Sequence, residues 1–111
     1  FMDIQIRSEG TVKVVTITGT IDGATAPVAQ TQINAQGGPG AKVVLDMGDV
    51  DFMSSAGLRM LLAAYRIIGG QGGKVVLARL PEELHDTMEL TGFLNFFQTF
   101  DSVAAGIAEL C

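Results

Sequence analysis

Two adjacent serines, Ser54 and Ser55, are the residues of this chain best placed to take part in chemistry. They lie between an apolar stretch that ends in an acidic turn and a segment with the apolar spacing of a helix. A serine at the start of a helix can cap it, because its hydroxyl oxygen accepts a hydrogen bond from an unpaired backbone amide. A phosphate on such a hydroxyl would be stabilised by the same amides and by the helix dipole. The residues alone leave both roles open.

Other patterns that could do chemistry fail when their spacing is checked. The glycine clusters at 37–40 and 69–73 lack the G-x-x-x-x-G-K-[ST] spacing of a phosphate loop, so we interpret them as turns. Asp46, Asp49 and Asp51 begin like a calcium loop, but Met53 occupies the next ligand position. The single histidine, His85, has neither a second histidine nor a nearby cysteine. We therefore expect no metal, no cofactor, no catalytic residue and no enzyme activity.

Size and charge exclude further classes of function. The chain has 111 residues, 48% of them hydrophobic, which predicts one domain over residues 1–111 with one well-filled core. A net charge of −5 without any basic cluster argues against nucleic-acid binding. No apolar run is long enough to insert into a bilayer, and no leader sequence opens the chain. With a single cysteine at its end, the chain is predicted to be cytoplasmic.

The order of the predicted elements indicates an α/β fold. Alternating β-branched stretches at 3–8 and 11–19 predict a hairpin, and a helix follows from Thr25 to about Ala35. Two continuous apolar runs, 42–47 and 74–80, predict buried parallel strands around a helix from Ser55 to about Ile68, with the turn 48–53 before it. A helix started by Pro81 ends at Gly92, the segment 94–100 is expected to be a short strand, and Asp101 or Ser102 caps a last helix. The sheet should have four or five strands.

The helix after the serines has apolar residues on both sides. On a wheel centred on Leu58, the predicted core face carries Leu61, Leu62 and Tyr65. The predicted outer face carries an apolar stripe flanked by Arg59 and Arg66, and its members are Ala56, Met60, Ala63 and Ile67. Either another element of the domain covers this stripe, or it is the docking surface for a partner.

Residues 43–66, VVLDMGDVDFMSSAGLRMLLAAYR, closely resemble the signature of STAS domains, in particular that of the bacterial anti-sigma factor antagonists. The resemblance extends over nearly the whole chain and implies a mixed sheet with helices packed mainly on one face. It also implies binding to an anti-sigma factor that is a GHKL-type serine kinase, with release of a sigma factor. In that family the kinase inactivates the antagonist by phosphorylation and a PP2C-type phosphatase restores it.

The resemblance assigns the site residues by position. The family's acceptor serine lies two residues before the signature glycine, which is Gly57 here, so it matches Ser55; the family's loop aspartate matches Asp22. Ser54 and Ala56 stand where the family has aspartate and serine or threonine, which makes Ser54 an alternative acceptor. The predicted partner-binding residues are Asp22, Ser54, Ser55, Ala56, Arg59, Met60, Ala63 and Ile67. We expect unphosphorylated Ser55 to cap the helix, so that a phosphate would act mainly on the partner.

Two other functions compete with a phosphorylation-switched antagonist. One is a STAS subunit that docks constitutively, without a switch, in a lipid-transport or stressosome-like complex. The other is a component of an enzyme that binds a small ligand or nucleotide, which is disfavoured because the sequence shows no convergent set of polar pocket residues.

Overall fold

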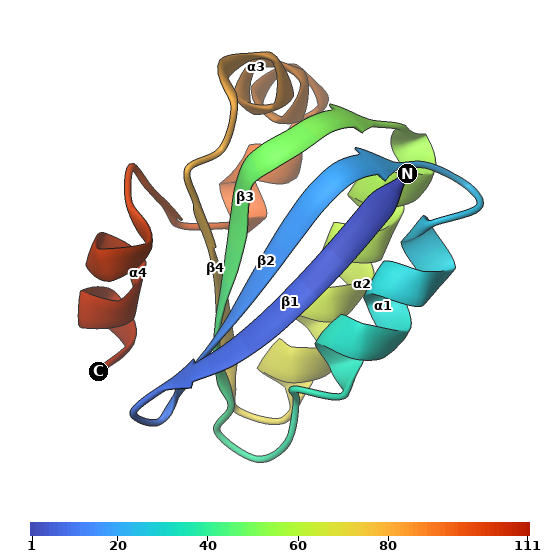
Figure 1. Cartoon of the computed structure of the whole chain (residues 1–111). Helices are drawn as coiled ribbons and strands as arrows, with labels where there is room; N and C mark the ends of the chain where they lie inside the picture. Colours follow the sequence, from blue (N-terminus) through green and yellow to red (C-terminus); the bar gives the residue numbers. More distant parts are fainter.

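The computed structural model describes residues 1–111 and contains a five-stranded sheet with four α-helices (Figure 1). In chain order the elements are β1 (Met2–Glu9), β2 (Val12–Ile21), α1 (Ala26–Asn34), β3 (Lys42–Met53), α2 (Ser55–Gly70), β4 (Lys74–Ala78), α3 (Glu82–Thr91), the 3₁₀ helix η1 (Phe93–Phe96), β5 (Thr99–Phe100) and α4 (Val103–Leu110). The strands lie in the sheet in the order of the sequence. β1 runs antiparallel to β2, and β2 to β5 are parallel to one another.

Local sequence explains the connections. The β1–β2 hairpin turns at Gly10, whose φ of 63° lies in the left-handed region that glycine adopts without steric cost. Each parallel pair of long strands needs a helical crossover, and α1 and α2 supply them between β2, β3 and β4. α3 ends at Gly92, which adopts a left-handed conformation as predicted, and Ser102 caps α4 by accepting a hydrogen bond from the Ala105 amide.

The sheet has an apolar layer on each face. Alternate residues of β2 point to opposite sides, with Val15 and Ile17 in one cluster and Val12 and Val14 in the other. The larger cluster has 20 buried residues and includes side chains of α1, α2 and α3. The smaller cluster has six, where Leu110 of α4 packs on the sheet. The α/β fold with a mixed sheet and helices mainly on one face is confirmed, and no helix combines the length and apolar character needed to cross a membrane.

The predicted turn at 48–53 is wrong, because β3 continues through it to Met53. The pairing with β2 shifts register twice, between Thr16 and Thr18 and between Gly19 and Thr20. Such bulges add residues to one strand without ending the ladder. Glycine and aspartates therefore occur inside a bulged strand here, although their types are typical of turns.

The predicted strand at 94–100 is only partly correct. The chain makes a 3₁₀ turn over Phe93–Phe96 and then a two-residue strand, Thr99–Phe100. Gly92 begins this turn, accepting a hydrogen bond from the Asn95 amide at 3.3 Å, and Phe97 enters the core. Of the aromatic residues in this segment only Phe97, which directly follows the 3₁₀ turn, is buried, and Phe96 is exposed.

Candidate functional site

The two serines lie at the carboxyl-terminal edge of the parallel strands, where β3 leads into α2 (Figure 1). The Ser54 amide donates to the Ile21 carbonyl at 2.9 Å, which fixes the junction to the end of β2. Ser54 is the N-cap of α2, because its hydroxyl oxygen accepts a hydrogen bond from the Ala56 amide at 3.2 Å. The expectation that Ser55 caps the helix is therefore wrong; the cap is Ser54, one residue earlier.

Ser55 is the first residue of α2 and is exposed. Ser54 already supplies the capping oxygen, so the Ser55 hydroxyl is not required for the helix start. The first turn of a helix carries partial positive charge from its unpaired amides. A negative group on Ser55 would consequently be added at an accessible and electrostatically favourable position.

Asp22 lies in the loop between β2 and α1 and organises that loop. Its Oδ1 accepts hydrogen bonds from the amides of Ala24 at 2.9 Å and Thr25 at 3.1 Å. These hydrogen bonds lower the pKa of the Asp22 carboxyl from its ordinary value. The bond from the Thr25 amide has the larger effect and the bond from the Ala24 amide the next largest. Because the Ser54 amide donates a hydrogen bond to the Ile21 carbonyl, the Asp22 loop and the serine junction lie at the same edge of the sheet.

Gly57 allows α2 to approach the ends of β2 and β3 closely. A side chain at this position would collide with Met53, and its Cβ would lie 3.0 Å from Cγ2 of Ile21. Gly57 is itself buried. The absence of a side chain at Gly57 therefore allows the serine-bearing end of α2 to pack closely against both strands.

The predicted apolar outer stripe of α2 is wrong for Met60, which is 2% exposed and belongs to the main core. The buried face of α2 is Gly57, Leu58, Met60, Leu61, Ala64 and Ile68. It is rotated from the predicted face because α2 packs against α1 and η1 as well as the sheet. Tyr65, predicted to be in the core, is 36% exposed at the edge of this face.

The remaining predicted contact residues differ in accessibility. Arg59 and Ser55 are exposed, Ile67 is 43% exposed, and Asp22, Ser54, Ala56 and Ala63 are half-buried. Ser55, Arg59 and Arg66 share the solvent side of α2. Partner binding by these residues stays a prediction.

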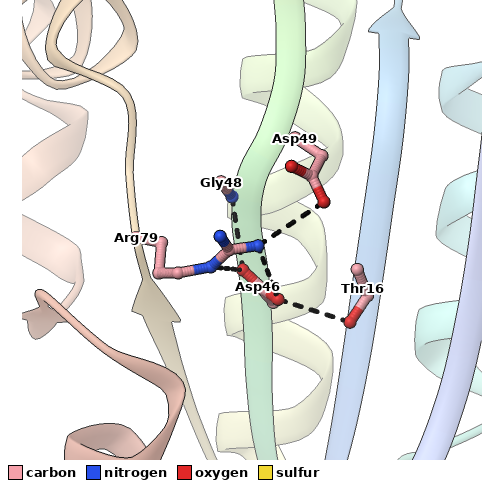
Figure 2. Close-up of polar contacts among 5 residues, drawn as sticks. All are labelled: Thr16, Asp46, Gly48, Asp49 and Arg79. Carbon is pink, nitrogen blue, oxygen red and sulfur yellow. Dashed lines mark hydrogen bonds and ion pairs between the residues drawn. The ribbon is translucent and has the colours of Figure 1, made fainter.

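Sequence reasoning missed an ion-pair cluster on the α4 side of the sheet (Figure 2). Arg79, which follows β4, contacts Asp46 of β3 at 2.8 Å and Asp49 at 3.5 Å. Thr16 of β2 donates to Asp46 Oδ2 at 3.4 Å, and the Gly48 amide donates to Asp46 Oδ1 at 3.3 Å. The available signal was an aspartate in the middle of an apolar strand, since such a residue needs a cationic or hydrogen-bonding partner when it is buried.

The structure offers no group of three or more histidine, cysteine, aspartate or glutamate side chains arranged to hold a metal ion. The Asp46–Arg79 cluster contains two carboxylates, those of Asp46 and Asp49, and the Arg79 guanidinium already donates hydrogen bonds to both. Ser54, Ser55 and Asp22 instead place hydroxyl and carboxylate groups around the start of α2.

Comparison with known proteins identifies the family. The family model described as the STAS domain matches residues 3–106. The chain belongs to the STAS domain family. A Bordetella bronchiseptica protein, BtrV, proposed to be an anti-sigma factor antagonist, is 34% identical over 91 residues, covering 81% of this chain and 78% of BtrV. The anti-sigma-B factor antagonist of Bacillus subtilis is 32% identical over 93 residues, covering 84% and 85%.

Solved structures show the same fold. An anti-sigma factor antagonist from Mycobacterium paratuberculosis superposes with a TM-score of 0.85 at 25% identity, covering 99% of this chain and 94% of that one. SpoIIAA, an anti-sigma factor antagonist, in its unphosphorylated form gives a TM-score of 0.78 at 13% identity, covering 97% and 96%. At that identity the second likeness concerns the fold alone.

Proposed function

We propose that this chain is an anti-sigma factor antagonist, which docks an anti-sigma factor through the edge that carries Ser55. The names of the relatives from Bordetella bronchiseptica and Bacillus subtilis support the proposal, since both cover most of this chain. The observation that carries it is the separation of roles at the junction, where Ser54 caps α2 and leaves the Ser55 hydroxyl exposed. Release of a sigma factor is a cytoplasmic function, and the proposal places the protein in that compartment.

The proposed switch is phosphorylation of Ser55 by the anti-sigma factor itself, acting as a GHKL-type serine kinase. A phosphate adds about −1.5 to −2 charges at neutral pH. It would join an edge that already carries Asp22 and the exposed Asp51, in a chain with a net charge of −5. The helix dipole tolerates this charge, whereas a partner surface built to accept a neutral hydroxyl would not. A PP2C-type phosphatase would reverse the modification.

The proposed docking surface follows the solvent side of α2 from the serine junction. Asp22 and Ser55 lie at its start, and Arg59 follows one turn along the helix. The side chains of the half-buried Ala56 and Ala63 are short, so the backbone of a partner can approach this face of α2 closely. Ile67, two turns further, contributes an exposed apolar side chain. Met60 has no part in this surface because it is buried.

Phosphotransfer tests the switch directly. A candidate anti-sigma factor of the GHKL-type kinase class is incubated with the protein and ATP, and mass spectrometry of the peptides locates the modified residue. We expect one phosphate on Ser55 in the wild type and in Ser54→Ala, and none in Ser55→Ala. Because the two serines are adjacent, Ser54→Ala is a matched control for the loss of a hydroxyl. A phosphate on Ser54 alone would contradict the assignment of Ser55.

Calorimetric binding to the same anti-sigma factor tests the consequence of the charge. Ser55→Ala should bind like the wild type, and Ser55→Asp should bind at least about tenfold more weakly, a change of about 1.4 kcal/mol. Equal binding by both variants would show that the chain docks constitutively. That result would favour a STAS subunit of a lipid-transport or stressosome-like complex over an antagonist with a switch.

A further inference from the structure

An open cavity of about 540 Å³ lies at the end of α2 opposite the serines. It is formed by the last turns of α2, the first residues of β4 and the segment from η1 to β5. Its volume is within the range of about 300 to 1,000 Å³ that small-molecule sites occupy in proteins. In Figure 1 the last turns of α2 are the lower, yellow end of this helix.

The residues that line the cavity are cationic or neutral, and none is an aspartate or a glutamate. Arg66 and Lys74 line it, and neither takes part in any ion pair of the chain. In a chain with a net charge of −5, a cavity with this composition stands out as a site of positive potential.

One wall of the cavity is aromatic and fixed in position. Tyr65 and Phe96 line it, with ring centroids 5.6 Å apart and ring planes inclined at 59°. Tyr65 also packs edge-on against Phe97 at 5.5 Å, and Phe97 is only 7% exposed. Tyr65 and Phe96 themselves are 36% and 44% exposed. The buried ring therefore holds an accessible aromatic surface, which favours contact with a flat apolar group.

Two glycines of α2 keep the cavity open. Gly69 and Gly70 line it and lie in the last turn of the helix, where glycine is less favourable than alanine. Neither has a positive φ, and a Cβ at either position would meet no atom within 4 Å. The fold therefore does not require glycine at these two positions. A side chain at either position would instead occupy part of the cavity beside the end of α2.

We propose that this cavity binds a small organic anion with a flat apolar body, such as an aromatic carboxylate or sulfonate. Arg66 and Lys74 contact the anionic group, and Tyr65 and Phe96 contact the ring system. The carbonyls of Ile68 and Gly69 at the helix end accept hydrogen bonds from Gly73 at 2.9 Å and Gly72 at 3.0 Å. The negative end of α2 is thereby partly satisfied, which reduces its repulsion of an anion. This site is separate from Ser55 and does not depend on the proposed switch.

The protein reports on this site without a label. Tyr65 is its only tyrosine and it has no tryptophan, so ultraviolet emission from the chain above the phenylalanine band comes from the cavity wall. The probe is anilinonaphthalene sulfonate, titrated into the full chain at low salt. We expect saturable quenching of Tyr65 emission with energy transfer to the dye. Phenylnaphthylamine, which has the same rings without the sulfonate, should bind at least about threefold more weakly if charge contributes.

Matched variants separate this site from general adhesion of the dye. Arg66→Gln and Lys74→Gln should each raise the dissociation constant about three- to tenfold, as loss of one charge-assisted contact predicts. Arg59→Gln removes an equally exposed arginine two turns earlier on α2, outside the cavity, and should leave the constant within about twofold. Gly69→Ala and Gly70→Ala should weaken binding while the unfolding midpoint stays the same or rises. A damaged fold cannot produce that combination.

Several outcomes would overturn the proposal. One is equal loss of affinity in Arg59→Gln and Arg66→Gln, and another is dye binding that leaves Tyr65 emission unchanged. Binding of the neutral analogue as tightly as the sulfonate would remove the role of Arg66 and Lys74. If an acidic aromatic peptide bound while the dye did not, the cavity would be a peptide contact instead. None of these results would alter phosphotransfer to Ser55, so failure here is distinguishable from failure of the proposed function.

Discussion

The guanidinium of Arg79 makes two hydrogen bonds to the carboxylate of Asp46, from Nε to Oδ1 at 2.8 Å and from Nη2 to Oδ2 at 3.1 Å. This contact with Asp46 is the main reason that the pKa of Arg79 is raised from its ordinary value. Arg79 has a φ of 55°, a left-handed conformation that is unfavourable for residues other than glycine. The pair joins the residue that follows β4 to β3, on the strand that leads to the serines (Figure 2).

The first prediction concerns Arg79. Arg79→Ala should lower the free energy of unfolding by about 1–3 kcal/mol, because the Asp46 carboxylate would be left without its cation. The upper end is discounted because the Arg79 side chain is 42% exposed, whereas that of Asp46 is 7% exposed. Arg79→Gly loses the same ion pair but accepts the positive φ, and should be less destabilised by about 1 kcal/mol. Denaturant unfolding measures both, and equal values would contradict the account of the backbone.

The second prediction concerns Gly48, over which the Arg79 side chain lies. A Cβ at this position would collide with the guanidinium and would be 2.7 Å from its Nε. Gly48→Ala should therefore displace Arg79 from Asp46 and destabilise the wild type by about 1–2 kcal/mol. In the Arg79→Ala background the obstacle is absent, so the same substitution should cost less. Additive effects in this double-mutant cycle would show that the two residues are independent.

The parts of the fold that follow from local pattern were predictable. The hairpin, the strands on both sides of α2 and the ends of α3 depend on β-branched runs, glycine and proline. The continuation of β3 through Gly48–Met53 was not, because it depends on pairing with Thr18–Ile21 of β2, a part of the chain distant in sequence. The residue types of this segment predict a turn, whereas its pairing with β2 imposes a strand.

The candidate site was predicted to a similar degree. Ser55 and Asp22 could be located from the resemblance to the family, and both lie at one edge of the sheet. The face of α2 could not be assigned from the wheel alone, because apolar residues surround most of the helix. Met60, predicted to be on the outer face, is buried, and Tyr65, predicted to be in the core, is partly exposed. The packing of α1 and η1 against α2 sets this rotation of the helix. The cavity at the other end of the helix has no sequence signal, since its lining comes from separate elements.

The third prediction distinguishes the two serines by stability. Ser54→Ala removes the N-cap hydrogen bond to Ala56 and should lower the free energy of unfolding by about 1 kcal/mol. Ser55→Ala removes an exposed hydroxyl that does not supply the cap, and should change it by less than about 0.5 kcal/mol. Thermal or denaturant unfolding of the two variants side by side provides the measurement. A larger loss in Ser55→Ala would mean that the cap is assigned to the wrong serine.

The fourth prediction is a pH dependence at Asp22. The pKa of this carboxyl is lowered in the folded state by the amides of Thr25 and Ala24. A lowered pKa gives stability that is present above the unfolded-state value and is lost as pH falls through the folded-state value. Wild type should therefore be more stable than Asp22→Asn at neutral pH, and the difference should shrink in acid, below the ordinary range of aspartate. Unfolding curves of both proteins at several pH values test this.

A carbon-detected NMR titration of the side-chain carboxyls would give the Asp22 value directly. An Asp22 midpoint at or above the ordinary value of an aspartate carboxyl would contradict the hydrogen-bonded loop.

The fifth prediction concerns Gly57, which seats the serine-bearing end of α2 against β2 and β3. Gly57→Ala would place a methyl group against Met53, with Ile21 next to it, and should destabilise the protein by about 1–3 kcal/mol through overpacking. Gly69→Ala on the same helix meets no atom within 4 Å and should not destabilise it, which makes it the matched control. Shortening the obstructing side chain in Gly57→Ala/Met53→Ala should recover part of the loss. If the double variant recovered folding but not binding of the anti-sigma factor, the position of α2 relative to the Asp22 loop, and not stability alone, would be what the glycine provides for docking.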